Sequence, residues 1–177
     1  MRLVVLLAAV VAIVVLVFRA YTTGDVAPGG PAGGPSMLAG APAQSFQLPR
    51  LGGGTGSLAD YRGRIVVLTL WATWCPPCRA EMPDLERVHR ALAARGVVIL
   101  GIDQGESAQA AGAFVRELGV TFPILLDEQQ QYGRVYEAVG LPTTIVVDRT
   151  GHIVRGIDGP VTFTQVRDIV AQLLAAR

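Results

Sequence analysis

Two cysteines separated by two residues, Cys75 and Cys78, constrain this chain more than any other feature. They are the only cysteines in the 177 residues. The preceding run, residues 65–70, is short, apolar and β-branched, as is typical of a buried strand. The following run, residues 79–95, carries apolar side chains at near-helical spacing. We therefore expect Cys75 at the N-terminus of a helix, with Cys78 one turn further along.

A cysteine at a helix N-terminus is suited to redox chemistry. The helix macrodipole and the free backbone N–H groups favour a negatively charged sulfur, and the thiolate is the nucleophile in disulfide exchange. A C-x-x-C pair near a βαβ pattern therefore predicts a redox-active disulfide, Cys75–Cys78, as the only redox group, with no other cofactor. We expect Cys75 to be the exposed nucleophile and Cys78 to resolve the mixed disulfide.

A purely structural role and a zinc-binding role for the cysteine pair are both less favoured. A structural disulfide would close a very small loop and would stabilise the fold little through chain entropy. A zinc site would need further ligands, and the sequence has no second Cys pair or Cys/His pair to supply them. The sequence therefore predicts no metal site.

Several separated segments resemble the thioredoxin-like superfamily, in the membrane-tethered branch that holds the TlpA, ResA and CcmG (DsbE) proteins. The matching stretches are residues 40–48, 58–64, 71–83, 140–144 and 148–153. The resemblance covers about three-quarters of the chain. It implies an α/β thioredoxin-like fold, in which helices flank both faces of a central mixed β-sheet. It also implies an N-terminal β extension and a βα insertion after the redox helix.

Local patterns place the elements of this fold. Strands are expected at residues 46–51, 65–70, 97–102, 124–126, 143–147 and 153–157, the last two as a hairpin. Helices are expected at residues 79–95, 129–139 and 162–176 and after Ser107, with one helical turn at 57–61. Thr162 and Gln165 form a capping box for the last helix.

The resemblance assigns a substrate-binding loop, Leu141-Pro142-Thr143, which faces the C-x-x-C pair and pairs with the substrate chain. Pro142 is expected to be cis, because a constrained turn is where cis bonds are found; a trans proline that starts a strand is the alternative. Trp74 is expected to shield the disulfide and to form part of the docking surface. Trp71 fits a place in the core at least as well.

The two prolines between the cysteines, Pro76 and Pro77, belong to the same expected substrate surface. Neither has an N–H, so two donors that could face the Cys75 sulfur are missing. The first remaining donor is the N–H of Cys78. We infer a less stabilised thiolate, which suits a reductant, although Pro76 is also a favourable first residue for a helix.

Glu81 is the third candidate catalytic residue. It follows Cys78 by three positions and so lies on the same helix face. In ResA-like proteins a glutamate here lies beside the cysteines, which implies a proton relay to or from Cys78. A solvated glutamate near the helix start fits the pattern equally well.

Thr69 departs from the family, because thioredoxins have a buried aspartate there and many TlpA-like proteins an asparagine. Thr69 cannot exchange a proton near neutral pH, which leaves Glu81 or water.

Residues 1–21 are expected to form a signal anchor. Leu3 to Phe18 is an unbroken apolar run between Arg2 and Arg19. It is slightly shorter than the roughly 20 residues that a spanning helix needs, and residues 20–21 can extend it. A cleaved signal peptide is the alternative, but no small-x-small site follows closely. The charges place the N-terminus in the cytoplasm and the rest outside, in a single-pass arrangement at the cell membrane.

Residues 22–44 are rich in Gly, Pro and Ala and are expected to form a flexible tether. Its average reach is roughly 25–30 Å. Residues 45–177 are expected to form the thioredoxin-like domain. The formal net charge of +1 gives no reason to expect nucleic acid as a partner.

The sequence predicts a membrane-anchored thiol–disulfide oxidoreductase that reduces substrate disulfides outside the cytoplasm. The resemblance implies apocytochrome c cysteines or copper-site thiols of an oxidase subunit as substrates. It also implies that a membrane thiol transporter of the CcdA or DsbD type reduces the cysteine pair again after each reaction.

The alternatives are a general extracytoplasmic disulfide oxidoreductase and a copper chaperone that uses both cysteines and a histidine. His89 and His152 are isolated, however, and are expected to be surface residues. A peroxidase is disfavoured, because the two-proline C-x-x-C replaces the peroxidase Thr-x-x-Cys pattern.

Overall fold

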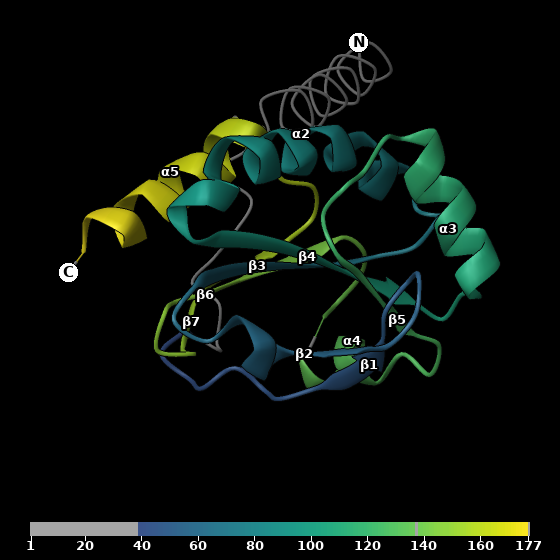
Figure 1. The fold of residues 1–177 in the computed structure, drawn as a ribbon, viewed down its shortest axis with the longest axis horizontal. Helices are drawn as coiled ribbons and strands as arrows, with labels where there is room; N and C mark the ends of the chain where they lie inside the picture. The colour runs from purple at the N-terminus through teal and green to yellow at the C-terminus, as the bar shows by residue number, and fades with distance from the viewer. Residues whose placement is uncertain (1–38, 137, 177) are drawn as a thin grey trace, which may run out of the picture. The chain divides into compact units, whose positions relative to one another are not determined.

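The computed structural model of the chain describes residues 39–136 and 138–176 (Figure 1). The expected anchor, residues 1–21, and all of the expected tether up to residue 38 lie outside the described residues. No helix in the described ranges combines the length and the apolar character that crossing a membrane requires.

The core of the fold is a five-stranded mixed sheet in the order β5-β4-β3-β6-β7. Its strands are β3 (Ile65–Trp71), β4 (Val97–Gln104), β5 (Ile124–Asp127), β6 (Thr143–Val147) and β7 (Ile153–Asp158). β3 runs parallel to β4 and antiparallel to β6, while β4 and β5 are parallel and β6 and β7 antiparallel. The predicted mixed sheet and the hairpin are confirmed.

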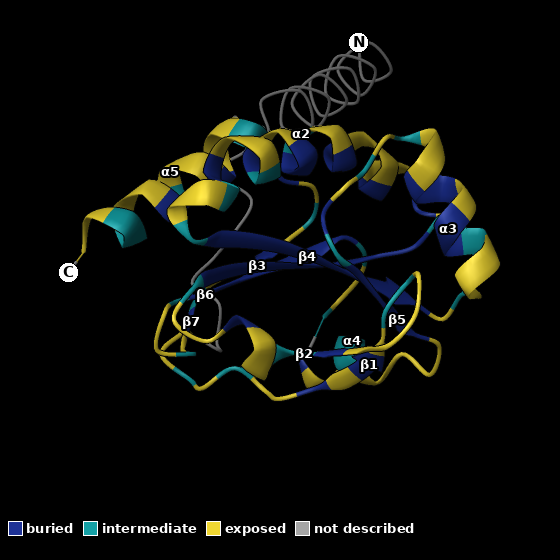
Figure 2. Cartoon of the chain, viewed as in Figure 1, coloured by how far each residue is buried: buried dark blue, intermediate teal, exposed yellow. Residues whose placement is uncertain are grey.

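Helices cover both faces of this sheet, as predicted. They are α2 (Pro76–Leu92), α3 (Ala108–Glu117), α4 (Gln131–Val135) and α5 (Phe163–Ala175), with 3-10 turns η1 (Leu58–Tyr61) and η2 (Ala93–Arg95). Figure 1 shows α2, α3 and α5 on one side and α4 with the β1–β2 hairpin on the other. β3, β4, β5 and β6 are buried between these layers, whereas the edge strand β7 is partly exposed (Figure 2). Each face has its own apolar cluster.

The helix starts follow from local sequence. The Ser107 hydroxyl accepts the N–H of Ala110 and so caps α3. The Thr162 hydroxyl accepts the N–H of Gln165, and the Gln165 side chain accepts the N–H of Thr162 at the start of α5. Both predicted caps are confirmed.

Two elements differ from the expectation. The helix predicted over 129–139 is limited to α4, which has Gly133 at its centre, a residue of low helix propensity. A strand β2 (Thr55–Ser57), which the Gly-rich sequence did not indicate, pairs with β1 (Gln47–Pro49). A Cβ atom on Gly56 would lie 2.7 Å from Cδ2 of Leu125, so any other residue here would require the Leu125 side chain or β2 to shift.

Candidate active site

The two cysteines form a disulfide at the start of α2, with their Cα atoms 5.3 Å apart. Cys75 is the N-cap residue, and Pro76 and Pro77 occupy the first helical positions. The N–H of Cys78 donates to the sulfur of Cys75 over 3.2 Å. This is the donor expected once the two prolines remove the earlier ones.

The exposure expected for Cys75 is wrong. Only 3% of Cys75 is accessible to solvent, against none of Cys78. The side chains pack into the apolar cluster beneath α2, which also holds Met82 and Leu85. Cys75 is still the more accessible of the two cysteines, which is the order expected for the nucleophile, and its role as the nucleophile stays a prediction.

One buried and one exposed tryptophan lie just before Cys75, Trp71 as the last residue of β3 and Trp74 in the loop that follows. Trp71 is fully buried and stacks on Phe114 with ring centroids 5.0 Å apart, which confirms its place in the core. Trp74 is 66% exposed. Between them, Thr73 donates its N–H to the Glu106 carboxylate over 2.6 Å, and its hydroxyl donates to the same group. Glu106 therefore holds the loop that precedes the nucleophile.

Sequence reasoning did not find Glu106 or its neighbour Asp103. Asp103 lies near the end of β4 opposite Trp71, is fully buried and accepts the N–H of Glu106. Burial, reinforced by the nearby Glu106 carboxylate, raises the pKa of Asp103 to about 8, so it is largely protonated at neutral pH. One signal was available: parallel strands end at the same edge of a sheet, which places the end of β4 beside the end of β3.

Glu81 is buried, so the alternative of a solvated glutamate is wrong. Only 2% of it is exposed, and its carboxylate accepts the Thr69 hydroxyl and the Val161 N–H, each over 2.9 Å. Burial raises its pKa to about 7, although both hydrogen bonds favour the charged form. Thr69, where the sequence departs from the family, is thus the donor that orients this carboxylate, one helical turn beyond Cys78.

The Leu141–Pro142 bond is cis, as predicted. Thr143 pairs with Leu70 near the end of β3, so this loop lies at the same end of the sheet as Cys75. The Thr143 hydroxyl donates to the carbonyl oxygen of Gly140 over 2.8 Å and braces the loop.

A groove of about 260 Å³ runs between this loop and the segment that precedes Cys75. It is lined by Trp74, Gln104, Gln130, Gly133, Arg134, Ala138, Val139, Gly140 and Leu141. Trp74 and Val139 are exposed apolar side chains, which suits the groove to an extended apolar peptide segment. The substrate-binding roles of Trp74, Pro76, Pro77, Leu141, Pro142 and Thr143 stay predictions.

The two histidines lie apart from the redox pair. His152 is exposed in the β6–β7 turn, while His89 is half-buried with its ring against Phe122. Across the described ranges, no group of three or more His, Cys, Asp or Glu side chains could hold a metal ion.

Trp74→Ala tests whether the groove binds protein substrates. Because interface tryptophans often dominate binding energy, we expect kcat/KM for a protein disulfide to fall about tenfold. Reduction of a small symmetric disulfide should change little, since it does not fill the groove. Stopped-flow oxidation of the reduced protein measures both rates, and Val135→Ala, another exposed apolar site outside the groove, is the control. Equal losses with both substrates would show that Trp74 acts on the disulfide itself.

Comparison with known proteins agrees with this geometry. The family model described as AhpC/TSA family matches residues 39–155. The thiol-disulfide oxidoreductase ResA of Geobacillus kaustophilus is 37% identical over 127 residues, 72% of this chain and 73% of the relative. ResA of Bacillus subtilis is 34% identical over 137 residues, 77% and 76% of the two chains. The crystal structure of a DsbF homologue from Corynebacterium diphtheriae superposes with a TM-score of 0.72 at 31% identity, covering 83% of this chain and 96% of that one.

Proposed function

This chain belongs to the AhpC/TSA family and is a thiol–disulfide oxidoreductase, and we propose that it works as a membrane-tethered reductant outside the cytoplasm. The observation that carries the proposal is the Cys75–Cys78 pair at the start of α2, where a single backbone N–H faces the Cys75 sulfur. Fewer donors stabilise the thiolate less, which raises the tendency of the dithiol to give up electrons.

The exchange takes two steps. In the reduced protein, the Cys75 thiolate attacks one sulfur of the substrate disulfide, the substrate S–S bond breaks, and one substrate thiolate leaves. Cys78, after losing its proton, attacks the Cys75 sulfur and releases the second substrate thiolate. Two electrons pass from the pair to the substrate, and the substrate thiolates take up two protons. A membrane thiol transporter of the CcdA or DsbD type then returns the pair to the dithiol.

Glu81 is proposed to take the proton from Cys78 or return it. A carboxyl group with a pKa of about 7 is charged and neutral in similar proportions at neutral pH, which is what a relay needs. Its position one turn beyond Cys78 supports this role, and Thr69 and Val161 keep it oriented.

We propose the haem-binding cysteines of apocytochrome c as the substrate. Their C-x-x-C-H segment is an unfolded chain when it carries a disulfide, so it can lie along the groove between Trp74 and Leu141. The resemblance to the TlpA, ResA and CcmG branch implies this substrate, whereas the printed names of the relatives support only thiol–disulfide exchange. General disulfide reduction is the second candidate. Copper-site thiols of an oxidase subunit would be handled by the same exchange.

The rate of reduction of two peptides distinguishes these substrates. One peptide carries an oxidised C-x-x-C-H segment, and the other has the same composition with its cysteines six residues apart. We expect the first to be reduced at least about tenfold faster, a difference of roughly 1.4 kcal/mol in the transition state. Equal rates would favour a general oxidoreductase. Stoichiometric copper after purification under reducing conditions would instead favour the chaperone.

The proposed anchor has its own test. In bacterial cells that express the full chain, the protein should stay with the membrane fraction, and protease added to spheroplasts should digest the redox domain. The expected cause is the apolar run from Leu3 to Phe18, which is close to the length of a membrane span. A protease-protected domain, or a soluble mature protein that starts after Ala20, would refute the anchor.

A further inference from the structure

The end of the sheet farthest from the redox pair holds a second cavity, of about 440 Å³. It lies where β3 begins and β6 ends, whereas Cys75 follows the other end of β3. The seven residues of β3 separate the two ends by roughly 20 Å. The cavity is lined by Pro42, Ala43, Ser45, Leu58, Ala59, Tyr61, Arg62, Arg64, Val66, Val147, Asp148, Arg149, Thr150 and Gly151.

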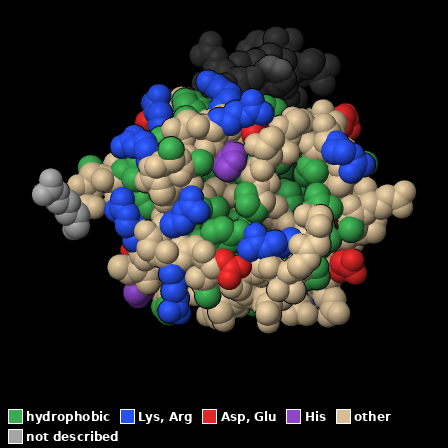
Figure 3. All heavy atoms as spheres, in the orientation of Figure 1, with side chains coloured by type: hydrophobic (Ala, Val, Ile, Leu, Met, Phe, Trp, Pro, Cys, Tyr) green, Lys and Arg blue, Asp and Glu red, His purple; other side chains and the backbone are tan. Residues whose placement is uncertain are grey.

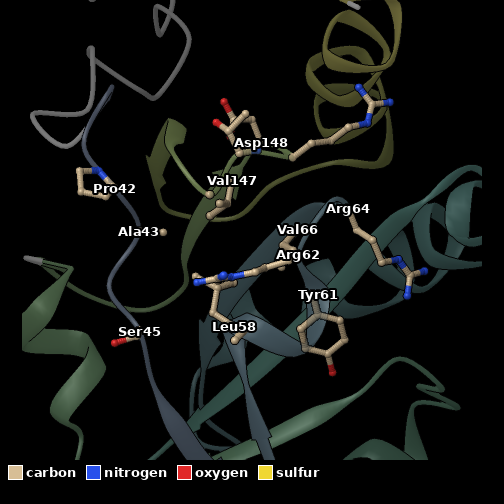
Figure 4. Close-up of a pocket in the computed structure, with 14 residues that line it drawn as sticks. Pro42, Ala43, Ser45, Leu58, Tyr61, Arg62, Arg64, Val66, Val147 and Asp148 are labelled. Carbon is tan, nitrogen blue, oxygen red and sulfur yellow. Dashed lines mark hydrogen bonds between the residues drawn. The ribbon is translucent and has the colours of Figure 1, made fainter.

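Arginines dominate the charge at this cavity. Arg62, Arg64 and Arg149 line it, and Figure 4 shows the Arg62 side chain lying between Leu58 and Val147. Arg95 is exposed nearby, since its neighbour Gly96 accepts the N–H of Ile65 at the start of β3. We call Arg62, Arg64, Arg95 and Arg149 the basic pole. In Figure 3, Arg side chains gather on the side where β6 and β7 lie.

Within the described residues, no carboxylate forms an ion pair with any arginine of the basic pole. The one acidic residue in the cavity lining, Asp148, accepts the N–H groups of Thr150 and His152 in its own turn. Arg149 donates to the carbonyl oxygen of Leu173 at the end of α5, so its recorded partner is a backbone carbonyl rather than a carboxylate. The basic pole is therefore a concentrated positive surface on a nearly neutral protein.

The chain enters the domain at this same pole. Gly40 donates its N–H to the carbonyl oxygen of Ile153, and Ala43 donates its N–H to that of Gly151. Pro42 and Ala43 also line the cavity. About twenty residues separate the apolar run that ends at Phe18 from this entry, and the expected average reach of a flexible chain of this length is roughly 25–30 Å.

We propose that the basic pole docks on the phosphate headgroups of anionic phospholipids and, while docked, holds the redox pair on the side facing away from the membrane, toward soluble substrates. Reduction by the membrane thiol transporter then takes place in the undocked protein, which the proposed tether still keeps at the membrane. The inference rests on the tether of the proposed function. Anionic lipids attract clustered arginines within about one Debye length, and the short chain keeps the pole near that surface. The cavity lining supplies the Arg62 guanidinium for a headgroup phosphate, and Arg64 and Arg149 add positive charge around it.

Paramagnetic relaxation in lipid nanodiscs tests the orientation. The full chain is inserted into discs that contain a headgroup spin label and either phosphatidylcholine alone or about one-third phosphatidylglycerol. In the anionic discs, amides of residues 59–64 and 148–152 should relax at least about tenfold faster than those of residues 75–78. In phosphatidylcholine discs, or at high salt, this contrast should vanish.

Charge reversal at the pole supplies the matched variant. Arg62→Glu/Arg64→Glu should abolish the contrast, whereas Arg116→Glu/Arg167→Glu, with the same change in net charge on α3 and α5, should keep it. The reduction rate of a soluble peptide disulfide should be the same in all three proteins, because none of these arginines belongs to the redox site.

Three results would overturn the inference. Full-chain protein held in both discs with uniform relaxation would refute the orientation and leave the tether intact. Protein that stays with neither disc would refute the anchor and the orientation together. Inorganic phosphate alone, without lipid, could shift the resonances of residues 62–64 as strongly as the anionic discs do. The cavity would then bind a soluble anion rather than a lipid headgroup.

Discussion

Replacing Cys78 with alanine is expected to turn the protein from a turnover catalyst into a trap. Cys75 can still open a substrate disulfide, but no thiol is left to release the mixed disulfide. Turnover should fall by at least about 1000-fold, as happens when a member of a catalytic unit is removed. Non-reducing gels of acid-quenched cells should show covalent complexes that disappear with dithiothreitol.

Cys75→Ala is the matched control for this trap. The remaining thiol, Cys78, has no solvent-exposed area, whereas 3% of Cys75 is exposed. Cys75→Ala should therefore lose turnover equally but accumulate few complexes. If Cys75→Ala gave the stronger trap, the two roles would be reversed.

Glu81→Gln is expected to remove a large part of the pH dependence of stability. Burial raises the pKa of Glu81 from an ordinary 4.5 to about 7. Between these values the unfolded chain has released the proton that the folded chain keeps, so the free energy of unfolding falls as pH rises. The shift corresponds to a contribution on the order of 3 kcal/mol to the free energy of unfolding. This contribution is present below pH 4.5 and is lost by the time the pH passes 7. Glutamine stays neutral and avoids that loss.

Urea unfolding of the oxidised proteins from pH 4.5 to 8 measures this difference. Asp103 has a raised pKa in both proteins, so its contribution cancels. Glu128→Gln, a change at an exposed glutamate, is the control and should follow the wild type. Parallel profiles for wild type and Glu81→Gln would show that Glu81 titrates as it does in water.

The same variant reports on the proton relay. A carboxylate near a partly buried thiol disfavours the thiolate, so Glu81→Gln should lower the thiol pKa and slow disulfide exchange near neutral pH. Alkylation rate against pH measures the first effect and stopped-flow exchange the second. Superimposable curves would assign the proton transfer to water.

Features encoded by neighbouring residues were predictable from the sequence. The Ser107 cap, the capping box of Thr162 and Gln165 and the strand before Cys75 each depend on side chains a few positions apart. The cis bond before Pro142 was predicted from family resemblance rather than from local energetics.

Long-range contacts were not predictable. Glu81 is oriented by Thr69 and Val161, which are 12 and 80 residues away, and Thr73 is held by Glu106 across 33 residues. No periodicity marks such partners, because the pairs meet only after the sheet and α2 have packed. The covering of Cys75 likewise depends on how α2 packs rather than on its own sequence.

The hydrogen bond from Thr69 to Glu81 also limits how this interior can change during evolution. An aspartate at position 69 would put a second carboxyl group within hydrogen-bonding distance of the first, and each would oppose the ionisation of the other. Valine would preserve the shape of threonine but would leave a buried carboxylate oxygen without its donor. A small neutral donor is what lets Glu81 ionise while it keeps its hydrogen bond. A lineage that moves between the thioredoxin-type acid at position 69 and the acid found here by single changes therefore passes through a pair of acids that share one proton, or through an ancestor with neither.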